Sequence, residues 1–413
     1  MANKTDLLIV GAGAAGLVCA GTAARGGLRV VLLEKMERPG RKLMITGKGR
    51  CNLTNNCSVD AFLAAVRKNS KFLYSAASAF TPQDTMALLE GLGVPLKTER
   101  GGRVFPVSDR SVDIVDALVR FARESGASVA HGRAARLLME ENRVLGVATQ
   151  DGRELPAEHV LIATGGKSYP LTGSTGDGYG LARQAGHTVT ELRPSLIPVV
   201  TEEEWCREAM GLSLKNVRLR LYRQDKPKAL FDEMGEMLFT HFGVSGPLVL
   251  SASAHMAGEL RRYRMAVDLK PGLAPEQLDA RILRDFQKYA NRDFQNALED
   301  LLPRSIIPVV VRLSGIAPGE KVHQVTRERR RQLVELLKGL PLTPKAFRPL
   351  EEAVVTSGGV KVGEVDPRTM ASKLAQGLYF AGEVLDVDAY TGGYNLQIAF
   401  CTGYLAAAGL AAK

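Results

Sequence analysis

The sequence is poor in cysteine, and its few cysteines are not arranged in pairs. Only five occur in 413 residues, namely Cys19, Cys51, Cys57, Cys206 and Cys401, and none belongs to a Cys-x-x-Cys motif. An odd number without that spacing argues against both a disulfide framework and a zinc site. Unpaired thiols suit a reducing compartment, so we expect a cytoplasmic protein without a metal site.

The chain also lacks a long apolar run, a targeting segment and an internal repeat. Its apolar N-terminal stretch is interrupted by glycines, which argues against a secretory signal. That stretch is only about 18 residues long and rich in Gly and Ala, which is poor material for a membrane-spanning helix. No lipidation motif is present. We therefore expect no membrane association.

Charge of one sign is in excess, and the excess lies in the middle of the chain. The formal net charge is +10, while the composition is otherwise ordinary, with 45% hydrophobic and 24% charged residues. Residues 193–350 hold about 26 Lys and Arg against about 19 Asp and Glu. A chain of this length supports two or three domains, and the basic excess favours an anionic partner such as nucleic acid.

The N-terminal segment combines an apolar strand, a glycine-rich turn and a small-residue helix. Residues 7–10 predict a buried parallel strand, which Gly11-x-Gly13-x-x-Gly16 connects to a helix over 17–24. A second strand over 29–33 ends at Glu34, placed to accept hydrogen bonds from ribose hydroxyls. The glycines provide a tight turn, close approach to a pyrophosphate and helix packing. This arrangement predicts a dinucleotide site.

A basic, glycine-rich segment follows Glu34 and spans residues 38–55. Its glycines permit a backbone wrapped around a ligand, and its cations are potential anion contacts: Gly40, Gly47, Gly49, Arg41, Lys42, Lys48 and Arg50. A solvated basic loop is the alternative interpretation. Beyond it we expect helices within 61–91 and 111–126, a small sheet over about 129–149, and a buried strand from residue 160 that ends in Thr164-Gly-Gly166.

The last segment returns to the chemistry of the first. Residues 377–383 predict a strand ending in Ala-Gly-Glu, and Gly392-Gly393 opens a C-terminal helix. A glycine pair at a helix N-terminus directs N–H groups toward a pyrophosphate or the pyrimidine end of an isoalloxazine ring. Two cofactor-like ends around a basic middle predict a split nucleotide domain with an insertion. That architecture is typical of a flavoprotein.

The insertion has strand-like alternation first and helical periodicity later. Strands are expected at 196–200, 217–222, 237–240 and 264–269, and helices within 274–302, 306–313 and 320–337. The domain prediction is a FAD-binding domain at 1–192 and 351–413, an inserted β domain at 193–272 and 326–350, and a small helical domain at 273–325.

Four motifs together resemble the BaiN/YhiN family of bacterial FAD proteins over essentially the whole chain. They are the glycine turn, Gly40-Arg-Lys with Gly47-Lys-Gly-Arg-Cys-Asn-Leu-Thr-Asn55, Thr240-His-Phe-Gly-Val-Ser-Gly-Pro247, and a C-terminal motif, Tyr379-Phe-Ala-Gly-Glu-Val-Leu-Asp-Val-Asp-Ala-Tyr-Thr-Gly-Gly-Tyr-Asn-Leu-Gln-Ile-Ala399. The resemblance implies an α/β fold with a split, glutathione-reductase-like Rossmann-type FAD domain. It also implies a FAD-dependent NAD(P)H oxidoreductase. One branch is named for bile-acid-type ene reduction, and another is associated with dihydrouridine in large-subunit ribosomal RNA.

The resemblance also implies which residues contact FAD. These are Gly11, Ala12, Gly13, Ala15 and Gly16 at the pyrophosphate, Glu34 and Lys35 at the ribose, and Arg41, Lys42, Thr46, Gly47, Arg50 and Asn52 on the flavin side. Val129, Ala130, Gly382, Glu383, Gly393, Asn395, Leu396 and Gln397 complete the set. Because no second complete dinucleotide fingerprint is present, we expect NAD(P)H to bind only transiently as the reductant.

Our leading hypothesis is reduction of uracil to dihydrouridine in ribosomal RNA, with the basic insertion gripping phosphates. The alternatives are an ene reductase of a small steroid or bile-acid-like substrate, and a non-catalytic flavin-containing RNA-binding or ribosome assembly factor. Uracil reduction needs a proton donor beside the flavin. Cys51 is the first candidate, because the neighbouring Arg50 is expected to lower its pKa, although a buried inert cysteine is the alternative. Tyr394 and His241 are the others, and His241 suits a structural role equally well.

Overall fold

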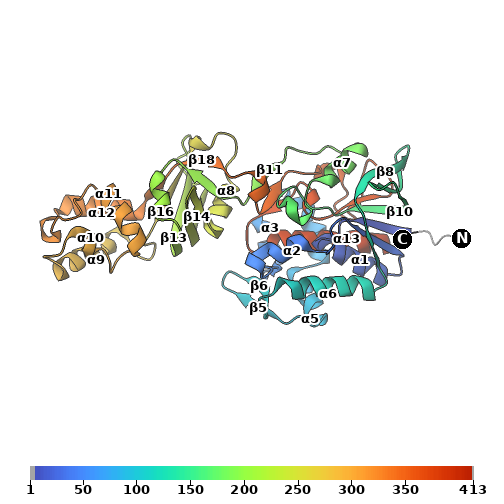
Figure 1. Cartoon of the computed structure of the whole chain (residues 1–413), viewed down its shortest axis with the longest axis horizontal. Coiled ribbons are helices and arrows are strands. Elements are labelled where there is room, and N and C mark those ends of the chain that lie inside the picture. Colours follow the sequence, from blue (N-terminus) through green and yellow to red (C-terminus); the bar gives the residue numbers. More distant parts are fainter. Residues whose placement is uncertain (1–4, 412–413) are drawn as a thin grey trace. The chain divides into compact units, whose positions relative to one another are not determined.

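The computed structural model describes residues 5–411, which form two compact units (Figure 1). One unit contains the chain up to residue 195 and from residue 350 onward, and the other contains residues 196–349. Each unit has a hydrophobic core of its own. The division of the insertion into separate β and helical domains stays a prediction, and its sheet and helices contribute to a single core.

The first unit is built on a sheet that joins both ends of the chain. Its parallel strands are β1 (Thr5–Val10), β2 (Val30–Glu34), β7 (Ser128–His131), β10 (Glu154–Ile162) and β20 (Leu378–Phe380). They lie in the order β7-β2-β1-β10, and β20 pairs with the free side of β10. Strand β20 comes from the C-terminal segment, so the split Rossmann-type α/β fold is confirmed.

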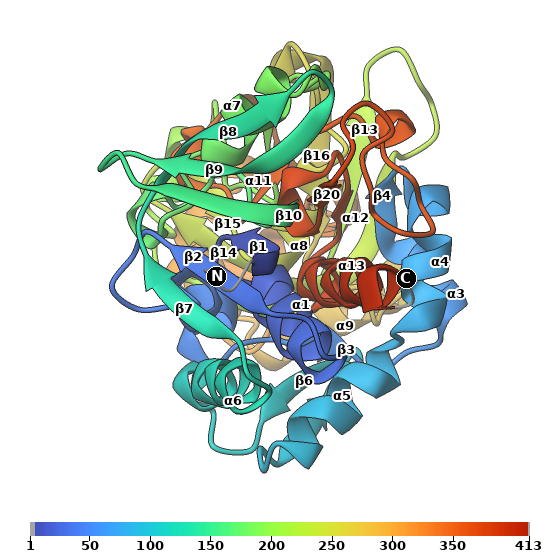
Figure 2. The same ribbon diagram turned by 90° about the vertical axis from the view of Figure 1, so that its right-hand side faces the viewer.

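Strand β10 belongs to two layers at once. Its C-terminal half pairs with β1, while Glu154, Leu155 and Pro156 pair antiparallel with β9 (Arg143–Thr149), which in turn pairs with β8 (Ala134–Glu140). Figure 2 shows β8 and β9 on the side of the parallel sheet opposite to α1 (Ala14–Arg25) and α13 (Tyr394–Ala411).

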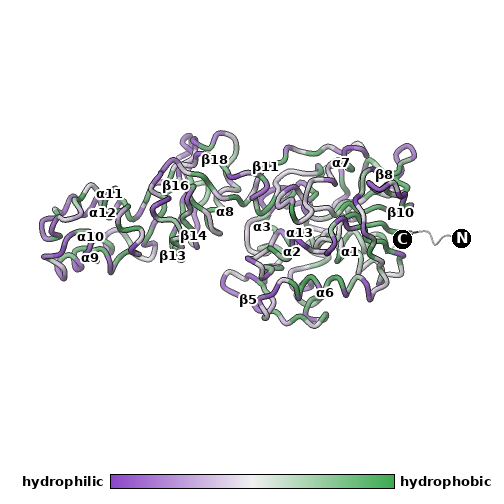
Figure 3. The backbone as a smooth tube through the Cα atoms, viewed as in Figure 1, coloured by the Kyte–Doolittle hydropathy of each residue, from purple (hydrophilic) through white to green (hydrophobic). Residues whose placement is uncertain are grey.

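Helices α1 and α13 pack closely because small residues line their contact. A Cβ atom added at Gly403 of α13 would lie 2.3 Å from the carbonyl oxygen of Ala15 in α1. On another side of α1, a Cβ at Gly21 would lie 2.2 Å from the Phe121 ring of α6 (Ser111–Glu124). Hydrophilic and hydrophobic residues alternate along α6, as expected for an amphipathic helix (Figure 3).

Shorter elements complete the first unit. They are α2 (Arg41–Ile45), β3 (Thr54–Asn55), α3 (Val59–Ala65), β4 (Val66–Lys68), α4 (Tyr74–Ala79), α5 (Pro82–Gly91), β5 (Leu96–Glu99), β6 (Arg103–Pro106), α7 (Asp177–Gln184), β11 (Arg193–Ser195), β19 (Val355–Ser357) and β21 (Asp388–Ala389). Strands β11 and β19 pair with each other where the chain leaves and re-enters this unit.

The second unit contains a seven-stranded antiparallel sheet in the order β17-β16-β13-β14-β15-β12-β18. Its strands are β12 (Val199–Thr201), β13 (Ser213–Arg223), β14 (Phe231–Thr240), β15 (Gly243–Ser245), β16 (Tyr263–Asp268), β17 (Leu340–Leu342) and β18 (Pro344–Phe347). Its helices are α8 (Pro247–Ser253), α9 (Pro275–Lys288), α10 (Phe294–Ala297), α11 (Ile307–Ser314) and α12 (Arg327–Lys338). Helix α12 begins later than residue 320 because the Thr326 hydroxyl caps it, accepting from Arg329 N at 3.3 Å.

Candidate functional site

The three glycines of the N-terminal turn have different surroundings. A Cβ at Gly11 would lie 2.6 Å from the Ala163 carbonyl oxygen, and a Cβ at Gly16 would lie 1.9 Å from that of Gly11. At Gly13, by contrast, an added Cβ would meet no atom of residues 5–411 within 4 Å. The first and third glycines therefore permit the turn and its packing, whereas the second leaves space open at the end of α1.

This open space lies at the N-terminus of α1, which is a favourable place for an anion. Gly13 caps the helix without a side-chain hydrogen bond, and the first turn contains no acidic residue. Unsatisfied N–H groups and the helix dipole both favour a phosphate there. Beside the turn, the buried Thr164 hydroxyl has no hydrogen-bond partner in the described chain. The residues present fit the pyrophosphate of a dinucleotide.

Glu34 lies at the end of β2 with its carboxylate directed at the turn. Its two oxygens accept hydrogen bonds from Ala12 N at 2.7 Å and from Met36 N at 2.8 Å. Because each carboxylate oxygen can accept more than one hydrogen bond, ribose hydroxyls can still bind to this side chain. The neighbouring Lys35 ammonium instead binds Asp177 at 2.8 Å and Thr175 at 2.5 Å. Its contact with the ribose stays a prediction.

The edge strand β7 brings Val129 and Ala130 beside the same region. They lie opposite Leu32 and Leu33 of β2, one residue before the position of Glu34. This register places their backbone next to the predicted ribose site. A backbone contact with adenine stays a prediction.

A half-buried ion pair connects the basic segment with the C-terminal segment. Lys42 Nζ lies 2.7 Å from Glu383 Oε2 and donates to the Ser168 hydroxyl at 2.8 Å. The other Glu383 oxygen accepts from Thr356 N at 2.9 Å. Ser168 lies in an irregular segment and Thr356 in the short strand β19, and neither carried a sequence signal. Nearby, Gly382 has a φ of 77°, and its N–H donates to the Thr402 hydroxyl of α13 at 2.9 Å.

Several predicted flavin-side residues have other partners. The Arg50 guanidinium binds Glu99 at 2.8 Å and Asp109 at 3.2 Å, and it lies 4.0 Å from the centre of the Phe105 ring. The Thr46 hydroxyl donates to the Leu43 carbonyl, and Gly47 packs against Asn52 with a φ of 58°. Of the predicted flavin-side cations Arg41, Lys42 and Arg50, only Arg41 is exposed and forms no ion pair within residues 5–411.

The glycine pair at the start of α13 packs against β3. A Cβ at Gly393 would lie 2.2 Å from the Thr54 carbonyl oxygen. In the amide orientation that satisfies its neighbours, Asn52 accepts from Gly393 N at 3.1 Å. Asn52 therefore holds the pair in place from the basic segment.

Two side chains of the C-terminal motif are used inside the protein. The Asn395 amide binds Ala389 N at 2.9 Å and Ala389 O at 2.8 Å. Gln397 is fully buried; its amide oxygen accepts from the Thr54 and Thr85 hydroxyls, and its nitrogen donates to Phe80 O. Their side chains are structural here, so any cofactor contact must come from the backbone. Leu396 lies between them, half-buried.

The expectation that charge lowers the pKa of Cys51 is wrong. Its side chain is completely buried, and burial raises the thiol pKa to about 12, although a hydrogen bond to Thr46 opposes this. The Arg50 charge is neutralised by its two carboxylate partners. Cys51 also has a φ of 61°, which fits a structural residue in a tight loop.

Alkylation tests this conclusion about Cys51. In the native protein at pH 8, iodoacetamide is expected to leave Cys51 unmodified, because its buried thiol stays protonated. The half-exposed Cys57 is expected to react and serves as the internal control. Peptide mass spectrometry measures both, and labelling of Cys51 as fast as Cys57 would contradict the buried, protonated state.

The other two candidate acids lie in different units. Tyr394 is the first residue of α13 and is half-buried, with its ring stacked 6.5 Å from that of Phe62. Burial raises the pKa of its hydroxyl, which has no hydrogen-bond partner within residues 5–411. His241 lies in the second unit, exposed between β14 and β15, with its ring against Phe242. Of the three candidate acids, only Tyr394 lies in the C-terminal motif, and its raised pKa favours the protonated hydroxyl.

Sequence reasoning missed Asp388, a buried carboxylate in this motif. It accepts from the Ser195 hydroxyl of β11 at 2.9 Å and from the Ser357 hydroxyl of β19 at 3.0 Å. Both strands that lead to and from the insertion are thus tied to the segment that precedes Gly392. Burial raises the pKa of Asp388, while hydrogen bonds from the two serines oppose the rise.

Asp388→Asn is expected to be more stable than the wild type at neutral pH. A carboxyl group whose folded pKa is raised above the unfolded value of about 3.9 binds its proton more tightly in the native state. As the pH rises, ionisation of Asp388 therefore lowers the free energy of unfolding of the wild type. This loss is absent below the pKa that the carboxyl group has in the unfolded chain. Denaturant unfolding should show a stability advantage for the variant at pH 8 that disappears near pH 4. An advantage independent of pH would contradict this account.

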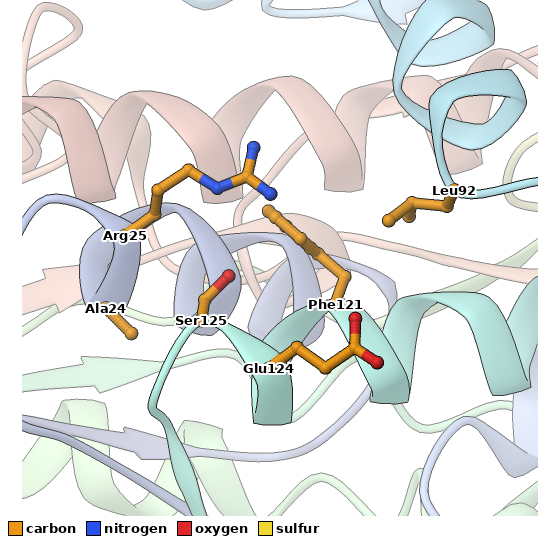
Figure 4. A pocket seen from close by; sticks show the side chains of 6 residues that line it. All are labelled: Ala24, Arg25, Leu92, Phe121, Glu124 and Ser125. Atoms are coloured by element: carbon orange, nitrogen blue, oxygen red, sulfur yellow. The ribbon is translucent and has the colours of Figure 1, made fainter.

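A separate surface hollow lies at the opposite end of α1. It has a volume of about 320 Å³ and is lined by Ala24, Arg25, Leu92, Phe121, Glu124 and Ser125 (Figure 4). The Arg25 guanidinium lies 4.9 Å from the centre of the Phe121 ring. This hollow is formed at helix C-termini and contains none of the predicted cofactor contacts.

Within the described residues, no helix is long and apolar enough to cross a membrane. The same part of the chain contains no group of three or more His, Cys, Asp or Glu residues placed to hold a metal ion.

Comparison with known proteins gives full-length matches. The 3-dehydro-bile acid delta(4,6)-reductase of Clostridium scindens is 33% identical over 96% of this chain and 97% of its own. The ribosomal RNA dihydrouridine synthase of Escherichia coli is 31% identical over 99% of both chains. The structure of a 3-ketosteroid-delta4-(5alpha)-dehydrogenase from Rhodococcus jostii RHA1 covers 98% of this chain and 97% of its own, with 14% identity and a TM-score of 0.51.

The structural likeness supports the fold alone, whereas the family profile and the sequence relatives define the family. The profile described as "HI0933-like protein Rossmann domain" matches residues 5–409. Together with the two full-length relatives, it confirms the resemblance indicated by the sequence motifs. The chain belongs to the HI0933-like Rossmann-domain family of flavin-dependent oxidoreductases.

Proposed function

We propose that the protein is a FAD-dependent reductase that converts uracil to dihydrouridine in large-subunit ribosomal RNA, with NAD(P)H as the reductant. The Escherichia coli relative named for this reaction matches 99% of the chain at 31% identity, and a Haemophilus influenzae protein of the same name matches at 29%. The bile-acid reductase matches at 33%. Sequence identity therefore does not decide whether the substrate is an RNA base or a small steroid acid.

The charge of the inserted unit is the observation that favours RNA. Residues 196–349 contain 25 Lys and Arg against 19 Asp and Glu, which gives this unit a net charge of +6. That is more than half of the net charge of +10 of the whole chain. Several of these cations are exposed and form no ion pair in the described chain, among them Lys215, Lys226, Lys228 and Arg264. A substrate with a single carboxylate needs one or two cations, whereas an RNA backbone can use many.

The residues of the first unit fit the cofactor and the chemistry. The N-terminus of α1 and Glu34 would hold the pyrophosphate and the ribose, and Lys42 with Glu383 would fix the loops on the flavin side. When bound, a reduced flavin supplies the hydride that saturates a C=C bond. Tyr394 would hold the proton needed at the neighbouring carbon, because its raised pKa keeps the hydroxyl protonated at neutral pH.

An ene reductase of a steroid-like acid is the second candidate, favoured by the 33% identity with the Clostridium scindens enzyme. A non-catalytic RNA-binding or assembly factor is the third. Transient binding of NAD(P)H and a cytoplasmic location remain parts of the leading proposal.

Turnover of defined substrates separates these functions. The flavin-loaded protein, NADPH or NADH, and unmodified transcripts of large-subunit ribosomal RNA are incubated without oxygen, and nucleosides are analysed by mass spectrometry. Dihydrouridine above the level of a reaction without reductant would support the proposal. Reduction of a panel of bile-acid enones without dihydrouridine would support the steroid reductase. RNA binding without oxidation of the nicotinamide would support the assembly factor.

A further inference from the structure

The sheet of the inserted unit has one face buried in the core and another that carries arginines. Along β13, Leu219 and Leu221 are fully buried, while the alternating Arg218, Arg220 and Tyr222 are partly exposed. Successive side chains of a strand point to opposite faces, so these three residues share the outer face.

Strand β16 adds a fourth residue to this face. Arg264 lies directly opposite Tyr222 in the antiparallel register, and its guanidinium is 5.2 Å from the centre of the tyrosine ring. Arg264 is exposed and has no carboxylate partner among the described residues. We call Arg218, Arg220, Arg264 and Tyr222 the arginine face.

The arginine face has more cations than nearby carboxylates can neutralise. Asp232 of β14 binds Arg218 at 2.5 Å and lies 3.6 Å from Arg220, so one acid serves two arginines. Asp268 lies opposite Arg218 but is buried and paired with Lys338 at 2.6 Å. Arg264 has no carboxylate partner within residues 5–411. The face therefore carries a net positive charge beside an accessible aromatic ring.

We infer that the arginine face binds an unpaired strand of the substrate RNA, an inference that rests on the proposed function. Three arginines on adjacent strands can contact successive phosphates, and Tyr222 with Arg264 offers a platform on which a base can stack. An open sheet face suits splayed bases better than a duplex, which is recognised mainly by shape. The exposed turn after β13 extends the positive charge through Lys226 and Lys228.

Binding of a fluorescent, unstructured RNA oligonucleotide to the full-length flavoprotein tests this assignment. In the variant Arg218→Gln/Arg220→Gln/Arg264→Gln, the slope of log affinity against log salt is expected to fall by about 2, because each phosphate contact on a single strand contributes about 0.7. Tyr222→Ala should weaken binding about tenfold with little change of slope, and Tyr222→Phe should retain it.

The matched control removes the same charge elsewhere in the same unit. Arg284→Gln/Arg327→Gln/Arg331→Gln replaces exposed arginines of α9 and α12 that form no ion pair in the described chain. Equal weakening by both triple variants, or no weakening by the arginine-face variant, would overturn the assignment. Circular dichroism and flavin content verify that each variant is folded.

Dihydrouridine formation by the wild type distinguishes the two possible failures. If the wild type modifies RNA while the arginine-face variant binds normally, the assignment of this face is wrong and the proposed function stands. If the wild type neither binds nor modifies RNA, the proposed function fails, and the inference fails with it.

Discussion

Gly13→Val is expected to abolish flavin binding while leaving the fold of the first unit intact. The residue has a φ of −84°, which any side chain can adopt, and an added Cβ would meet no atom of the described chain within 4 Å. The valine methyl groups would instead occupy the space at the end of α1 where backbone N–H groups meet a pyrophosphate. The dissociation constant for FAD should rise by about two orders of magnitude or more, as loss of phosphate contact and steric exclusion act together.

Flavin absorbance after purification and fluorescence titration of the apoprotein measure this change. Thermal unfolding must be compared between apoproteins, because a bound ligand raises the apparent stability of the wild type. Gly180→Ala changes a glycine in α7 whose added Cβ also meets no described atom within 4 Å, and this control is expected to keep flavin. Gly16→Ala should lose stability as well as flavin, because its Cβ would lie 1.9 Å from a carbonyl oxygen. Flavin retained by Gly13→Val would place the cofactor elsewhere.

The fold of the first unit was accessible from sequence because its determinants are local or periodic. The strand at 7–10, the glycine turn and the strand at 29–33 are contiguous, and their apolar residues are buried on both faces of the sheet. The pairing of β20 with β10 depends on a contact across more than 200 residues, yet the two ends share the same cofactor chemistry. Similar chemistry at both ends was thus sufficient to place them together.

The functions of individual polar side chains were less accessible, because distant partners decide them. Arg50 forms ion pairs with Glu99 and Asp109, and Gln397 accepts hydrogen bonds from Thr54 and Thr85. No sequence signal predicts these partners. The Cys51 pKa was misjudged for the same reason. Arg50 is next to Cys51 in sequence, but its guanidinium charge is neutralised by Glu99. It therefore has little effect on the Cys51 pKa, which burial of the thiol raises.

Tyr394→Phe is expected to lower the rate of substrate reduction by about a hundredfold or more, while flavin content and reduction of the protein by NAD(P)H stay unchanged. Loss of a positioned general acid typically costs two to four orders of magnitude. Phenylalanine preserves the half-buried ring and its contact with Phe62 but removes the only proton that this residue can deliver. The two half-reactions, followed separately by stopped-flow absorbance, therefore give different results for a proton donor.

Tyr404→Phe is the matched control for this experiment, because it makes the same change on the same helix, where the ring stacks on Phe80 at 4.6 Å. It should leave both half-reactions unchanged. The wild-type rate should also persist from neutral pH to above pH 10, since burial raises the Tyr394 pKa and a donor is active only while protonated. Equal loss in both half-reactions would show that Tyr394 positions the flavin. No loss in Tyr394→Phe, with loss in His241→Gln, would move the proton donor to the inserted unit.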